Sequence, residues 1–133
     1  MIVPPKQIGS VRIGMSHVAV EQRIGAGRPR PTTPGKVLTV RYPRVGLEAV
    51  YARAGDSAAR PVIAILTRDP RYHTSSGVRV GSTLGTVARL TGVHCFDREQ
   101  TCQQGFRRHG RPGVVYTLRN GKVVRIAAYA FAD

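Results

Sequence analysis

The alternation of apolar and polar residues predicts where the strands of this chain lie. The segment 36–42 alternates as a half-buried strand does, with one apolar and one more polar face. Apolar runs at 47–53 and 61–69 follow and predict two further strands. The residues of the first segment that would face a core are Leu38, Val40 and Tyr42.

Near the C-terminus, two apolar runs flank the dipeptide Asn120-Gly121. Asn-Gly between apolar runs is the strongest short hairpin signal, because both residues tolerate a positive φ. We therefore predict a hairpin whose strands lie at 113–118 and 122–131.

Three segments interrupt this pattern and predict connections. The segment 25–35 is rich in glycine and proline, and 54–60 is a short polar turn. The segment 97–113 is polar and irregular. We expect all three to lie outside the regular elements.

Two segments of the chain have similar sequences. Residues 11–25 align without a gap with residues 78–92, and five of the fifteen positions are identical. Each copy predicts a short strand, a turn at a glycine and a helix of about two turns, since Ser16 and Thr83 are good N-caps. The glycines expected to end these helices in the left-handed conformation are Gly25 and Gly92.

The predicted order is a short helix followed by three antiparallel strands, and it occurs twice. One such unit is too small to bury much apolar surface, whereas two copies can share a core. We therefore predict an α+β fold with a duplicated unit of short helix plus three antiparallel strands. Both helices would pack on one face of a shared antiparallel sheet. The single domain would span 1–133, with repeats at about 8–69 and 75–133.

The net charge of the chain indicates which classes of partner it attracts. The chain has 133 residues and a formal net charge of +14, and 18 of its 21 basic residues are arginine. Such an excess attracts polyanions, namely nucleic acid, anionic lipid or an acidic protein. An arginine-rich, lysine-poor composition also arises in GC-rich genomes, so charge alone does not select a partner.

The sequence also bears on localisation. No run of 18 apolar residues predicts a transmembrane helix, and the first ten residues contain no apolar signal core. We expect either a mature or trimmed form of an exported protein or a cytoplasmic protein.

Cys95 and Cys102 are the two cysteines of the chain. In an exported protein such a pair predicts one disulfide that closes a small loop. The alternatives are two free thiols or a metal site with His94 and His109, although the spacing matches no usual zinc pattern. We expect no metal and no cofactor.

Five arginines are candidates for binding an anion or a partner. Arg12 and Arg79 occupy equivalent positions of the similar segments, where guanidinium groups could hold carboxylate or phosphate, or only cover a helix edge. Arg41, Arg119 and Arg125 lie on predicted strands and could face outward together.

The same strand arginines raise the alternative of nucleic-acid binding. Recognition of single strands also needs stacking aromatic residues. Tyr129 and Phe131 share the predicted face of Arg125, and no known nucleic-acid motif occurs.

The sequence contains no residue pattern that indicates a catalytic site. The seven carboxylates show no paired spacing, and His94 directly precedes Cys95, so the two would point to opposite faces of a strand. We therefore expect a non-enzymatic protein.

The stretch GMSHVAVEQRIG at 14–25 resembles the signature G-M-[ST]-x-x-E-V-x-x-x-[LI]-G. That signature marks the small outer-membrane lipoprotein of the bacterial β-barrel assembly machine. The chain is also similar to the β-lactamase inhibitory proteins, which are built from two tandem helix-plus-sheet repeats. Its segment 73–82, HTSSGVRVGS, resembles an element of uncharacterised secreted actinobacterial proteins. The matching positions are Gly14, Met15, Ser16, Val20, Ile24 and Gly25, then Gly81, Thr83, Val87 and Gly92.

The resemblance implies a non-catalytic envelope or extracellular protein that binds other proteins. Combined with the charge, it predicts a secreted or envelope-associated binding protein whose partner is a protein or an anionic envelope component. The alternative is a basic cytoplasmic protein that binds nucleic acid.

Overall fold

The structure is a computed structural model, and it describes residues 2–3, 7–30, 37–52, 60–74, 77–105 and 113–129. His109 and Phe131, named above as candidates, lie outside these ranges. No helix of the described residues is long and apolar enough to cross a membrane.

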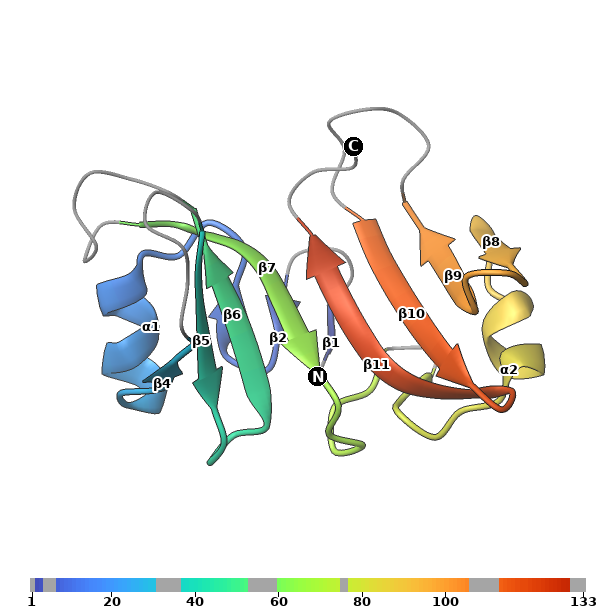
Figure 1. The fold of residues 1–133 in the computed structure, drawn as a ribbon, viewed down its shortest axis with the longest axis horizontal. Helices are drawn as coiled ribbons and strands as arrows, with labels where there is room; N and C mark the ends of the chain where they lie inside the picture. Colours follow the sequence, from blue (N-terminus) through green and yellow to red (C-terminus); the bar gives the residue numbers. More distant parts are fainter. Residues whose placement is uncertain are drawn as a thin grey trace.

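An antiparallel sheet of eight described strands dominates the fold (Figure 1). The strand order is β4-β5-β6-β7-β11-β10-β9-β8, so the two halves of the chain meet where β7 pairs with β11. The strands are β4 (Arg28–Pro29), β5 (Leu38–Tyr42), β6 (Leu47–Tyr51), β7 (Val62–Thr67), β8 (Val93–Phe96), β9 (Thr101–Gln104), β10 (Gly113–Arg119) and β11 (Lys122–Tyr129).

Short elements cover one face of this sheet. The helices α1 (His17–Ile24) and α2 (Leu84–Ala88) lie near its two ends, and a small sheet lies between them (Figure 1). The strands of the small sheet are β1 (Ile2–Val3), β2 (Gln7–Ile8) and β3 (Val11–Arg12).

The predicted fold class is wrong. The described residues lie mostly in β-strands, and the two helices have only eight and five residues. The structure is therefore one large sheet and not a duplicated unit of helix plus three strands. Each helix fully buries a single residue, Val20 in α1 and Val87 in α2. The strands supply most of the buried apolar side chains, and the fold is therefore organised by its sheet.

The helix starts are confirmed, but one helix end is wrong. The Ser16 and Thr83 hydroxyls accept from the backbone N–H groups three residues later, at 3.2 and 3.3 Å. Gly25 ends α1 with a positive φ of 85°, as predicted, but its ψ of 173° lies outside the left-handed helical region. The second helix already ends at Ala88, so Gly92 does not cap it. Gly85 and its β-branched neighbours are poor helix formers, which shortens α2.

Two predicted loops contain strands. β4 lies within 25–35, and β9 lies within 97–113 and pairs with β8 just before it. β9 is polar, and β4 has two residues, one of which is a proline. Local sequence therefore carries little strand signal there, and pairing with neighbouring strands decides the conformation.

The predicted hairpin at Asn120-Gly121 is confirmed. Both residues have a positive φ, 53° and 75°, and β10 pairs with β11 across the turn. The alternation of the first predicted strand is confirmed as well, since Val40 and Tyr42 of β5 are buried while Arg41 between them is exposed.

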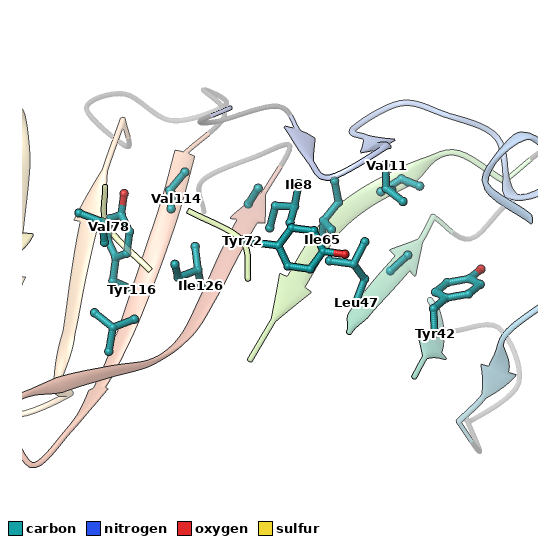
Figure 2. Packing of buried hydrophobic residues seen from close by; sticks show 14 of the residues in the cluster. Ile8, Val11, Tyr42, Leu47, Ile65, Tyr72, Val78, Val114, Tyr116 and Ile126 are labelled. Atoms are coloured by element: carbon teal, nitrogen blue, oxygen red, sulfur yellow. The ribbon is translucent and has the colours of Figure 1, made fainter. Parts of the chain in front are cut away.

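The core lies between the large sheet and the elements that cover it. Figure 2 shows Ile8 and Val11 of the small sheet in one cluster with Ile65 of β7 and Ile126 of β11. Tyr72 lies among them, and its hydroxyl donates to the Val45 carbonyl at the β5–β6 turn. The core thus spans the junction of β7 and β11.

The two similar segments make equivalent backbone contacts. The Gly14 N–H donates to the Val62 carbonyl at 2.8 Å, and the Gly81 N–H donates to the Val123 carbonyl at 2.7 Å. These bonds attach the turn before each helix to an inner strand of the sheet. The division of the chain into repeats at about 8–69 and 75–133 stays a prediction.

Candidate functional site

The second face of the large sheet, here called the outer face, points away from the helices and the small sheet. Strand pairing is continuous across it, so one row of side chains runs from β4 to β8. The row consists of Arg28, Arg41, Glu48, Leu66, Ala127, Val115, Gln103 and His94. None of the described helices packs against this face, since the helical core residues belong to the cluster on the opposite side.

The outer face is strongly basic. Glu48 is the one acid among its described strand residues. Arg30 comes directly after β4, and Arg68 comes after β7. Both also reach this face, because their guanidinium groups contact Glu48. The basic residues of the outer face are Arg28, Arg30, Arg41, Arg68, Arg119, Lys122 and Arg125.

The middle of the outer face is apolar. Ala64 and Leu66 of β7 and Ala127 of β11 are buried there, with Val50 and Tyr129 packed against them. These side chains cover one another across the β7–β11 junction. The basic residues therefore flank a small apolar centre rather than cover the whole face.

Three arginines converge on Glu48. Its Oε1 atom lies 2.9 Å from a nitrogen of Arg30 and 3.7 Å from nitrogens of both Arg41 and Arg68. The arginine side chains are 49%, 58% and 60% exposed, and Glu48 is 12% exposed. One negative charge is shared by three positive ones, which leaves a local excess of two positive charges.

An open cavity of about 460 Å³ lies beside this cluster. Arg41 and Arg68 line it together with Glu48, and Leu66 and Pro43 add apolar walls. Cavities of this size accommodate small ligands.

Asp69 also lines the cavity, but Arg71 already neutralises it. The Asp69 carboxylate lies 2.7 Å from the Arg71 guanidinium and accepts from the Arg71 backbone N–H at 2.9 Å. These hydrogen bonds hold the pKa of Asp69 below its usual value. Asp69 is thus paired with Arg71 rather than with Arg41 or Arg68.

The structure separates the five predicted arginines into two groups. Arg41, Arg119 and Arg125 lie on the outer face, as predicted. Three strand spacings separate Arg41 on β5 from Arg125 on β11, which corresponds to about 14 Å. Arg12 and Arg79 are exposed on the other side, beside the small sheet and the turn that precedes α2.

Arg125 lies directly opposite Thr117 of β10. The Arg125 Nε and the Thr117 Oγ1 atoms are both buried and have no hydrogen-bond partner among the described residues. Tyr129 shares the outer face with Arg125, as the nucleic-acid alternative requires, whereas Phe131 lies outside the described residues.

The predicted disulfide is confirmed. Cys95 of β8 and Cys102 of β9 are directly paired in register and bonded to each other. Cys102 is fully buried, and Cys95 is exposed. Because both sulfurs are bonded, they are neither free thiols nor thiolate ligands for a metal.

Sequence reasoning missed a polar network at α1. The Glu21 carboxylate lies 2.9 Å from the His17 Nε2 atom and accepts from the Tyr42 hydroxyl at 2.9 Å. The Tyr42 and Tyr51 hydroxyls are 2.6 Å apart, and the His17 ring packs on the Tyr51 ring. Burial raises the pKa of Tyr51 to about 12 and that of Tyr42 still further. The spacing of His17 and Glu21, four residues apart on a helix, was the available signal.

Arg30, Arg68 and Glu48 were also missed. Glu48 could have been found, because a four-residue turn after Tyr42 pairs Arg41 with Glu48 on the next strand. Arg30 and Arg68 gave no such signal, since both directly follow a strand and their position depends on the sheet order.

The sequence matches no family model and no curated protein. Among solved structures, the fold is similar to that of an extracellular protein containing a SCP domain from Bacillus anthracis. The TM-score is 0.58 at 10% sequence identity, and the match covers 97% of this chain and 50% of that one. The chain thus corresponds in length to about half of that structure, and the similarity is one of fold.

Proposed function

We propose that this chain is an exported, non-enzymatic protein that binds an anionic component of the cell envelope on the outer face of its sheet. The observation that carries the proposal is the charge of this face, where Glu48 is the one acid on the described strands and seven basic residues lie on these strands or directly follow them. A face with this balance attracts a polyanion and gains affinity from the release of its counterions.

Two observations support export. The disulfide between Cys95 and Cys102 is of a kind that persists in oxidising compartments outside the cytoplasm. The solved structure with a similar fold is described as an extracellular protein.

Binding to an immobilised polyanion such as heparin, measured against salt concentration, tests the outer face. The variant R28E/R119E/R125E reverses three charges there and keeps all four residues of the cluster around Glu48. We expect it to lose at least about tenfold in affinity at low salt, with a shallower salt dependence than the parent protein.

The matched control is R23E/R79E/R89E, which changes the net charge equally on the opposite side. We expect the control to lose less than about threefold, because it leaves the outer face unchanged. Equal losses in both variants would show that only net charge matters and would contradict the proposal. Tighter binding of single-stranded DNA than of heparin at equal charge would favour the nucleic-acid alternative instead.

A further inference from the structure

The cluster around Glu48 has N–H donors that are available to bind an anion. Arg30 donates the one hydrogen bond to Glu48 in this cluster, while Arg41 and Arg68 stay 3.7 Å from the same oxygen. Within the described residues, neither of these two guanidinium groups donates a side-chain hydrogen bond. An arginine carries five N–H donors in a planar fork, so both groups have donors available.

The two arginines face the cavity from strands on either side of Glu48. Arg41 lies on β5 and Arg68 directly follows β7, which puts their backbones two strand spacings, or about 10 Å, apart. Long side chains of more than half exposure can close on a group between them. A tetrahedral anion with oxygens on several sides can accept from both forks at once.

The charge balance selects the kind of anion. The cluster has an excess of two positive charges, and Asp69 does not reduce it because Arg71 neutralises that carboxylate. A phosphate monoester carries nearly two negative charges at neutral pH and compensates this excess, whereas a single carboxylate compensates half of it.

We propose that Arg41 and Arg68, beside Glu48, form a binding site for a phosphate monoester in this cavity. The inference rests on the proposed function and specifies its chemistry, because it assigns recognition of the anionic partner to a terminal phosphate group. The apolar walls at Pro43 and Leu66 would contact the carbon chain that bears the phosphate.

Calorimetric titration with glycerol 3-phosphate at pH 7.5 tests this site. We expect binding to weaken at least about tenfold in the variant R41A/R68A, since both donor forks are removed. The double variant R23A/R89A removes the same charge from α1 and from the residue that follows α2, and it is expected to bind as the parent protein does.

The variant E48Q provides a readout that loss of structure cannot imitate. It removes the one negative charge of the cluster, so we expect tighter binding of glycerol 3-phosphate by several fold. Unchanged or weaker binding by E48Q, or parent-like binding by R41A/R68A, would overturn the proposal. Circular dichroism establishes that each variant is folded.

Two further titrations identify the ligand. Succinate has the same charge but no tetrahedral group, and binding as tight as that of glycerol 3-phosphate would contradict a phosphate site. If inorganic phosphate binds as tightly as the ester, the phosphate group alone is recognised. If it binds more weakly, the apolar walls of the cavity contribute to recognition of the ester. Both results support the site.

The outcome is distinguishable from that of the proposed function. R28E/R119E/R125E tests polyanion binding at residues outside the cavity. If glycerol 3-phosphate does not bind while heparin binding still depends on those three arginines, the phosphate site is wrong and the proposed function stands.

Discussion

Single residues in this protein combine structural and electrostatic roles. Glu48 contacts Arg30, Arg41 and Arg68, and it holds three like charges on a small area of the outer face. The arginine side of each pair is half exposed or nearly so, and solvent screening therefore limits what each pair contributes to stability.

Tyr51 leads to a prediction about alkaline pH. It is fully buried, and its pKa is raised from the usual 10 to about 12. Between these two values the unfolded chain loses the tyrosine proton while the folded protein keeps it. Stability contributed by this group is therefore complete below pH 10 and decreases as pH rises towards 12.

Urea unfolding between pH 8 and pH 12 measures this effect. The variant Y51F should be less stable at pH 8 by about 1 kcal/mol, because it loses the hydrogen bond to Tyr42. It should also show a shallower decrease at alkaline pH. Part of the decrease should remain, since burial raises the pKa of Tyr116 to about 12 as well. A slope as steep in Y51F as in the parent protein would contradict this assignment.

At the scale of elements, the β8–β9 hairpin shows how a weak local signal is overridden. β8 is largely exposed and β9 is polar, so neither buries much apolar surface by itself. The bond between Cys95 and Cys102 fixes their register at the edge of the sheet. The prediction of the disulfide was correct, but the strand that it stabilises was predicted as a loop.

Loss of this disulfide should destabilise the protein. The bond closes a loop with a sequence separation of seven residues, for which chain entropy predicts about 2–3 kcal/mol. Urea unfolding of C95A/C102A should show this loss, and a reductant should produce a similar loss in the parent protein. The reductant should not affect C95A/C102A further. An unchanged midpoint of the parent protein under reductant would refute the stabilising role.

At the scale of the whole molecule, charge opposes folding. The chain carries a net charge of +14, and a large part of it lies on one face of the sheet. Self-repulsion of this kind destabilises the compact state, and salt screens it over distances of about 10 Å at 0.1 M.

We therefore expect sodium chloride to stabilise the protein. Raising its concentration from about 0.02 to 0.5 M should increase the free energy of unfolding by about 1 kcal/mol, as measured by urea denaturation. The variant R28E/R119E/R125E, whose net charge is lower by six, should gain less. An equal or larger gain in this variant would show that repulsion on the outer face is not the cause.

The sequence by itself determined the local features of this protein. The caps at Ser16 and Thr83, the turn at Asn120-Gly121 and the alternating faces of β5 all follow from interactions between residues close in the chain. Sequence reasoning also named Arg41, Arg119 and Arg125 as strand residues that could face outward together, since side chains of a strand alternate between two faces.

Only the tertiary structure decided the fold class and the site. The pairing of β7 with β11 joins the two halves into one sheet, and no local pattern encodes this pairing. That order, together with the short edge strand β4, brings Arg30 and Arg68 to Glu48 from residues 18 and 20 positions away in the sequence. Contacts between distant segments depend on how the whole core packs, which is why Arg30 and Arg68 gave no signal in the sequence.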